Sequence, residues 1–172
     1  MPRLGAFLLI QQQNTAMIIR KLIPGDLAEF RRIRLEGLLN AAHAFGSNWQ
    51  KEQAEPDSLF LARLEHNHIW GVFTSGYELG GIAAYSVNDN EEGTIWGVYV
   101  AESLRGTGAS YQLMSALIND ARLRLSRLTL TVMNNNAPAI QFYRHLGFVH
   151  RAALPSSPAG DSSLQQWYLN LK

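Results

Sequence analysis

The hydrophobic pattern of this chain changes character near residue 100, and that change limits the folds it can adopt. Before it, three short apolar segments read as β-strands at residues 69–74, 79–87 and 94–100, and a four-residue connection makes the first two a hairpin. After it, residues 108–122 carry apolar side chains at helical spacing, and residues 128–132 alternate like a strand. Hairpin strands followed by strand–helix alternation predict one mixed sheet with helices packed on its faces.

Weaker patterns supply the other elements. Residues 43–55 are expected to form a loop. The remaining elements are a strand at 17–22, helices at about 26–40, 56–64 and 136–146, and two last strands at 148–153 and 164–171. No internal repeat or linker divides the chain, so we expect residues 17–172 to form a single domain. Residues 1–16 precede the periodic pattern and are interpreted as an N-terminal extension.

Composition excludes several classes of protein. Of the 172 residues, 47% are hydrophobic and 17% are charged, and the formal net charge is +1. These values exclude a largely disordered chain, and the lack of an 18-residue apolar run argues against a membrane span. The near-zero net charge argues against a dedicated nucleic-acid binder. The apolar run Leu4–Ile10 is short for a secretory signal and has no small-residue cleavage site after it, so a cytoplasmic protein is expected.

The content of cysteine and histidine argues against metal and thiol chemistry. The chain has no cysteine, which excludes disulfides, thiolate nucleophiles and cysteine-bound metals. The histidines show no spacing typical of metal ligands, so no metal site is expected. They are His43, His66, His68, His145 and His150.

A turn with two glycines and an arginine connects the strand at 94–100 to the following helix. The segment Arg105-Gly106-Thr107-Gly108-Ala109-Ser110 would direct several backbone N–H groups, together with the positive end of the helix, at one point. This arrangement predicts a site for phosphate or pyrophosphate, although Gly-x-Gly alone also suits a plain strand–helix turn. The residues after Gly108 do not match a P-loop, and the turn lies too late in the chain for a dinucleotide-binding fingerprint.

A second segment of interest begins the helix at 136–146. Asn136 starts this helix and Tyr143 lies seven residues later, about two turns along nearly the same face. Taken alone, the two residues suit a helix N-cap and a packed aromatic side chain.

Together, the two segments resemble the GNAT superfamily of acetyl-CoA-dependent N-acetyltransferases. The spacing is Val100-x4-Arg105-x2-Gly108-x-Ser110, followed by Asn136-x2-Ala139-x3-Tyr143-x3-Gly147-Phe148. The resemblance is strong over residues 94–148 and looser over 17–172, where it includes the loop at 44–47. Ser110 departs from the usual Gly or Ala but is still small. The resemblance implies an α/β (α+β) fold whose central mixed, mostly antiparallel sheet of about seven strands is flanked by about four helices.

The resemblance also implies roles for individual residues. The pyrophosphate of coenzyme A would bind the backbone amides of Arg105, Gly106, Thr107, Gly108, Ala109 and Ser110. The pantetheine arm would pair with the strand Val98, Tyr99 and Val100, as an added strand does. Asn136 would hydrogen-bond the cofactor near the pantetheine, and Tyr143 would be the general acid beside the sulfur. Gly97 is expected to form a bulge that separates this strand from the next one.

The implied reaction is acetyl transfer from acetyl-CoA to a primary amine by direct attack in a ternary complex. A chain without cysteine cannot form an acetyl-cysteine intermediate. The acceptor amine must first lose a proton, and Glu91, Glu92 or water held by backbone carbonyls are the candidates to take it. The expected partners are acetyl-CoA and a small-molecule or protein amine, without nucleic acid or membrane, and a homodimer is left open. The alternatives are a non-catalytic acyl-CoA-binding module and a structural protein that keeps only the fold.

The arginines of the first helix and the tryptophans have simpler interpretations. Arg31, Arg32 and Arg34 are expected to form a solvated helix face, with contact to an acidic substrate or to the 3′-phosphate as the alternative. The aromatic side chains expected in the core or in the cleft wall are Trp49, Trp70 and Trp96.

Overall fold

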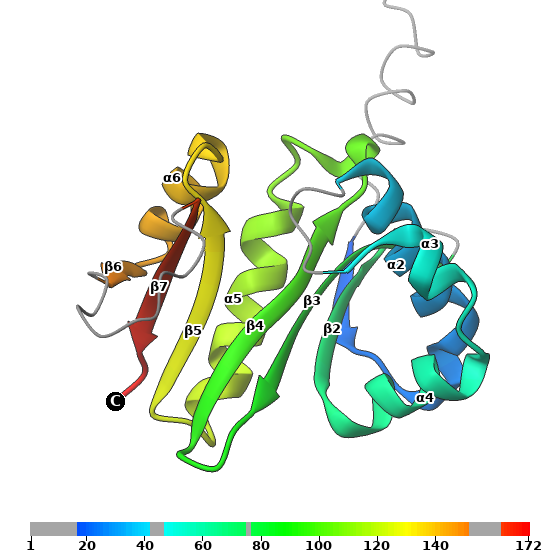
Figure 1. Ribbon diagram of the computed structural model, residues 1–172, viewed down its shortest axis with the longest axis horizontal. Helices are drawn as coiled ribbons and strands as arrows, with labels where there is room; N and C mark the ends of the chain where they lie inside the picture. Colours follow the sequence, from blue (N-terminus) through cyan, green and yellow to red (C-terminus); the bar gives the residue numbers. More distant parts are fainter. Residues whose placement is uncertain (1–16, 42–46, 75–76, 152–162) are drawn as a thin grey trace, which may run out of the picture.

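Seven strands form one sheet in the order β1-β2-β3-β4-β5-β7-β6 (Figure 1). The computed structural model describes residues 17–41, 47–74, 77–151 and 163–172. The expectations for residues 1–16, 43–46, 75–76 and 152–162 lie outside these ranges. The strands are β1 Ile18–Lys21, β2 His68–Phe73, β3 Leu79–Val87, β4 Glu92–Val100, β5 Arg127–Met133, β6 Val149–Arg151 and β7 Leu164–Asn170.

The sheet is mixed and mostly antiparallel, as expected. Every neighbouring pair of strands is antiparallel except β4 and β5. This parallel pair extends only from Glu92 opposite Arg127 to Thr94 opposite Thr129, so most of β4 has no partner on the β5 side. Figure 1 shows the two strands diverging beyond that point.

The described residues contain five α-helices and two short 3-10 turns, one helix more than expected. The additional helix, α3, lies in the segment that was expected to be a loop. Asn48 caps it by accepting a hydrogen bond from the Lys51 amide at 2.8 Å. Five residues are too few to show a helical period, which is why the pattern missed it. The elements are η1 Pro24–Asp26, α2 Leu27–Asn40, α3 Trp49–Gln53, α4 Asp57–His66, η3 Glu102–Leu104, α5 Ala109–Arg122 and α6 Ala137–His145.

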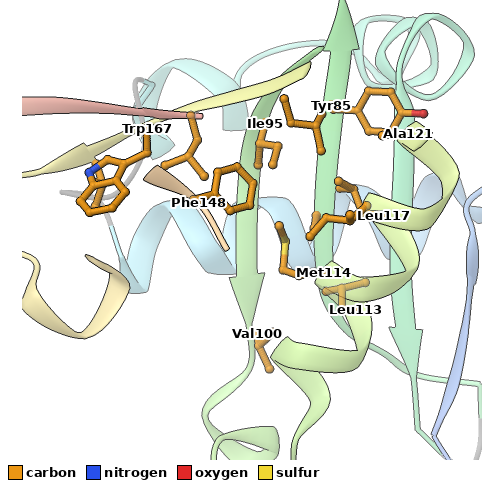
Figure 2. Packing of buried hydrophobic residues seen from close by; sticks show 14 of the residues in the cluster. Tyr85, Ile95, Val100, Leu113, Met114, Leu117, Ala121, Phe148 and Trp167 are labelled. Atoms are coloured by element: carbon orange, nitrogen blue, oxygen red, sulfur yellow. The ribbon is translucent and has the colours of Figure 1, made fainter. Parts of the chain in front are cut away.

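Two apolar clusters lie on opposite faces of the sheet. On one face α5 buries the apolar stripe expected from its sequence, and Figure 2 shows Leu113, Met114 and Leu117 among the side chains packed there with Val100 of β4. On the other face α2 and α4 bury side chains such as Phe30. Each such burial contributes about 1.5–3 kcal/mol. The strands in the middle of the sheet are therefore held from both sides.

The arginines of α2 do not form the solvated face that was expected. Arg34 is only 7% exposed, and Arg31 donates to the carbonyls of Gln53 and Glu55 at 3.0 and 2.8 Å. Arg32 donates to the carbonyl of Leu79 at 2.6 Å. The expectation was wrong because α3, α4 and the start of β3 pack against this side of α2, which its own sequence does not show.

Candidate active site

A β-bulge interrupts β4 in its middle. Ile82 of β3 lies opposite Tyr99 and Ala84 lies opposite Trp96, so β4 contains one residue more than β3 over this stretch. Gly97, within it, has φ of +65°, a backbone conformation that side chains other than glycine rarely adopt. The bulge expected at Gly97 is therefore confirmed. β4 stays paired with β3 on both sides of it, whereas its pairing with β5 ends before it, at Thr94.

A cavity of about 770 Å³ opens where β4 and β5 diverge. Its walls come from β4 residues 95–100, β5 residues 130–133 and α6, with the start of α5 at one end. Because β4 has no strand partner on this side, its backbone N–H and C=O groups are available to a bound molecule.

Seven of the eleven residues expected to bind acetyl-CoA or to act as general acid line this cavity. These are Val98, Tyr99, Val100, Arg105, Ser110, Asn136 and Tyr143. Gly106, Thr107, Gly108 and Ala109 are not among its lining residues and form the turn that leads to Ser110. Sequence analysis missed the wall supplied by β5 and by Phe142, because an alternating strand shows which faces it has but not which strand lies beside it.

The turn before α5 presents backbone amides without partners. Gly108 is the N-cap of α5 and has φ of +84°. Within the described part of the chain, the amides of Gly106, Gly108, Ser110 and Tyr111 have no hydrogen-bond partner. The Ala109 amide donates to the Thr107 hydroxyl at 3.3 Å. Unpaired amides at a helix N-terminus, together with the exposed Arg105, create a positive potential suited to an anion.

Asn136 is a helix cap and a cavity residue at once. Its Oδ1 accepts a hydrogen bond from the Ala139 amide at 3.3 Å, which starts α6. Among the described residues its side-chain Nδ2 has no partner, so that group can donate to a molecule in the cavity. The N-cap interpretation and the binding interpretation are therefore compatible.

Tyr143 contributes a phenol in mostly apolar surroundings. Its ring contacts those of Phe142 and Phe148, with centroids 5.5 and 5.8 Å away. Burial raises the pKa of Tyr143 to about 12, so the phenol is protonated at neutral pH. Its hydroxyl has no hydrogen-bond partner among the described residues. The hydroxyl can therefore donate a proton to a molecule in the cavity.

The acidic candidates from the sequence lie away from the cavity. Glu92 begins β4 and pairs with Arg127, the Oε1 and Nη1 atoms being 3.7 Å apart. Glu91 is an exposed turn residue with φ of +56°. Neither lines the cavity, and no carboxylate among the described residues does.

The described residues contain neither a metal-binding group nor a membrane-spanning helix. In the described ranges, no three or more His, Asp or Glu side chains gather into a group that could hold a metal ion. None of the helices described is both long and apolar enough to cross a membrane. Of the tryptophans, Trp96 lines the cavity and Trp70 donates from Nε1 to Asp120 at 3.3 Å.

Solved structures of similar fold are acetyltransferases. An acetyltransferase of the GNAT family from Staphylococcus aureus Mu50 matches with a TM-score of 0.70 at 20% identity, over 91% of this chain and 100% of that one. The ribosomal-protein-S18-alanine N-acetyltransferase of Escherichia coli matches with a TM-score of 0.66 at 21% identity, over 91% and 94%. A spermidine N-acetyltransferase chimera from Vibrio cholerae matches with a TM-score of 0.69 at 18% identity, over 90% and 95%. At these identities the matches show the fold.

The family follows from the sequence. No curated protein matches the chain significantly. The model of the acetyltransferase (GNAT) family matches residues 35–148, which is more than half of the chain and includes β4, the turn before α5 and α6. The chain therefore belongs to the GNAT family of acetyltransferases.

Proposed function

We propose that this protein is an N-acetyltransferase that moves the acetyl group of acetyl-CoA directly to a primary amine. One observation carries the proposal. A single cavity is lined by the unpaired side of β4, by Arg105 and Ser110 at the start of α5, and by Asn136 and Tyr143 of α6. Groups that can bind an anion, pair with the amides of a bound chain and donate a proton therefore surround one cavity.

The residues present suit the parts of acetyl-CoA in turn. The free amides of Gly108 and Ser110, with the Arg105 guanidinium, would bind the pyrophosphate. The pantetheine arm contains two amides, which would pair with the backbone of β4 on its unpaired side. Nδ2 of Asn136 would donate to a carbonyl of the same arm.

The chemistry needs two proton movements. The neutral amine nitrogen attacks the thioester carbonyl carbon, a C–N bond forms, and the C–S bond then breaks. The sulfur leaves with the electron pair of that bond and takes a proton from the Tyr143 hydroxyl, which is protonated at neutral pH because its pKa is raised to about 12. The proton lost by the amine passes to water, since no described carboxylate lines the cavity. Tyr143 then recovers its proton from water.

The acceptor is proposed only as a primary amine. Two of the similar solved structures are named for their acceptors, spermidine in one and an alanine of ribosomal protein S18 in the other. At about one-fifth identity these substrates do not transfer to this chain. They do define a first panel: spermidine, a peptide with an N-terminal alanine, a lysine peptide, single amino acids and an aminoglycoside.

The test follows thiol release from acetyl-CoA across this panel, with calorimetric binding of acetyl-CoA measured in parallel. We expect binding of acetyl-CoA and release of free CoA that depends on one class of amine, with one acetyl amide formed for each CoA. Binding without release with any amine would favour a non-catalytic acyl-CoA module. If acetyl-CoA does not bind at all, the result would favour a structural protein that keeps only the fold.

A further inference from the structure

A buried arginine of α2 reaches the segment of β4 that contains the bulge. Arg34 is 7% exposed and Glu52 of α3 is 1% exposed. Two parallel hydrogen bonds join them, from Nε to Oε1 at 3.0 Å and from Nη2 to Oε2 at 2.9 Å. This two-point contact fixes the orientation of both side chains.

The other side of the same guanidinium faces the bulge. The Arg34 Cζ atom lies 5.5 Å from the ring centroid of Trp96, a cavity residue. Nη1 of Arg34 lies 3.2 Å from the point where Gly97 would carry a Cβ. One side chain thus contacts the acidic residue of α3 and the two residues at the start of the bulge.

We propose that Arg34 is a positioning residue for acetyl transfer: held by Glu52, it keeps the bulged segment of β4, and with it the Trp96 side of the cavity, in the geometry that transfer requires. The inference rests on the proposed function for its catalytic consequence. Arg34 need not contact either substrate for this role.

Stability alone is a weak reason for such a pair. Taking two charges out of water is costly, and apolar replacements of a buried ion pair are often neutral or stabilising. The pair instead fixes the orientation of the Arg34 guanidinium, because a planar group bound at two points can lie against the bulge in only one way. Small displacements of a cavity wall matter, because misplacing reacting groups by about 1 Å can reduce a rate about a hundredfold.

The chain offers a matched control in Arg31. This arginine also joins α2 to the end of α3 and to the residues that follow it, through the carbonyls of Gln53 and Glu55. Its guanidinium lies over the ring of Phe60, 4.4 Å from the centroid, and no contact with β4 is found among the described residues. A variant of Arg31 therefore loosens the same helices without touching the bulge.

The experiment compares Arg34→Met/Glu52→Leu with Arg31→Met. Both changes of the double variant are made together so that no charge is left buried alone. Three quantities are measured: hydrogen exchange of the amides of residues 96–99, the affinity for acetyl-CoA by calorimetry, and kcat for CoA release with the amine found in the panel. Thermal melting checks that each variant folds.

For the double variant we expect exchange at residues 96–99 to become at least about tenfold faster. We expect kcat to fall about tenfold or more and the affinity for acetyl-CoA to change less than about threefold, because the turn before α5 is untouched. In Arg31→Met, exchange at 96–99 and kcat should stay as in the wild type even if melting shifts. Arg34→Lys, which keeps the charge without the two-point contact, should lie between the wild type and the double variant.

A folded double variant with wild-type exchange at residues 96–99 and wild-type kcat would overturn the inference. If the double variant does not fold, Glu52→Gln takes its place. Exchange at residues 96–99 and kcat should then change in the same direction but less, because one of the two hydrogen bonds from Arg34 survives. If the wild-type protein releases no CoA with any amine, the proposed function fails, while hydrogen exchange still decides whether Arg34 holds the bulge.

Discussion

At the residue scale, the proposed chemistry depends on one hydroxyl group. Tyr143 packs its ring against Phe142 and Phe148, and its hydroxyl has no acceptor among the described residues. In the proposed mechanism the ring serves for packing and the hydroxyl for proton donation. A substitution that removes only the oxygen separates them.

We predict that Tyr143→Phe lowers kcat for CoA release about 10²- to 10⁴-fold, the usual contribution of general-acid catalysis. Stability should change by less than about 0.5 kcal/mol, because the hydroxyl makes no hydrogen bond with any described residue. Affinity for acetyl-CoA, measured by calorimetry, should stay close to that of the wild type. Tyr77→Phe is the control, since Tyr77 is 85% exposed and lies outside the cavity lining. A wild-type kcat in Tyr143→Phe, with chemistry shown to limit the rate, would exclude this residue from the mechanism.

A second expectation concerns the proton of the acceptor amine. Because no described carboxylate lines the cavity, kcat/KM should follow the fraction of free amine in solution. It should rise about tenfold for each pH unit from about pH 6 to about pH 8 with an amine whose pKa is near 10. The measurement is kcat/KM against pH with the amine found in the panel. A plateau that begins well below the pKa of the amine would instead reveal a base within the protein.

At the element scale, the junction of β4 and α5 forms the proposed pyrophosphate site. The helix α5 begins at Ala109 after the N-cap Gly108, which has a positive φ, and η3 precedes this turn. The same junction places Arg105 and Ser110 at the end of the cavity. Strand β4 and the two ends of the turn that follows it therefore line the same cavity.

We predict that Gly108→Ala weakens acetyl-CoA binding at least about tenfold while the protein still folds. The left-handed conformation costs a residue with a side chain about 1–2 kcal/mol, so the turn should rearrange and its amides should no longer point together. The readouts are the calorimetric dissociation constant and the melting temperature. Gly25→Ala is the control, because an added Cβ there meets only Ile23 at an ordinary 3.8 Å. Unchanged affinity for acetyl-CoA in a folded Gly108→Ala variant would show that the pyrophosphate binds elsewhere.

At the scale of the whole molecule, a polar cluster far from the cavity links α5 to β1, β2 and β3. Oδ2 of Asp120 accepts from the Tyr85 hydroxyl at 2.7 Å and lies 3.6 Å from Nζ of Lys21. Lys21 in turn donates to Nδ1 of His68 at 2.5 Å. His68 stacks on Tyr85, with ring centroids 4.6 Å apart. Burial, then the charges of Lys21 and Arg124, lower the pKa of His68, while Asp120 opposes the shift.

This lowered pKa predicts a pH dependence of stability. Below the ordinary histidine pKa of 6.5, the unfolded chain takes up a proton at His68 that the folded protein resists, so stability falls as the pH drops through that value. Melting between pH 7.5 and 5 should show this loss, and His68→Gln, which keeps an acceptor for Lys21, should reduce the slope. His66→Gln, at the exposed end of α4, should leave the slope unchanged. Equal slopes for wild type and His68→Gln would refute the assignment. The interactions of Asp120 should be lost only at lower pH, because the pKa of Asp120 is lowered to about 2.

Most of the fold could be predicted from the sequence, because periodicity and turn residues are local signals. All seven expected strands are present, and α5 buries the stripe that its spacing indicated. The helix α3 was missed because it is too short to show a period. In the candidate site, Arg105, Ser110, Asn136 and Tyr143 were expected from the resemblance of their segments to the family, whereas the wall of β5 was not expected.

What the sequence determined by itself is therefore the order of the elements and the two segments that resemble the family, since each is specified by residues near one another in the chain. A separation of β4 from the next strand was already expected at Gly97, whereas only the tertiary structure decided that the pairing with β5 ends after Thr94 and that β5 supplies the facing wall of the cavity. It also decided that Arg34 is buried against Glu52, 18 residues away, rather than solvated. The reason is physical: burial and the pairing of strands depend on which distant segments meet, and a helix face appears solvated until something packs on it.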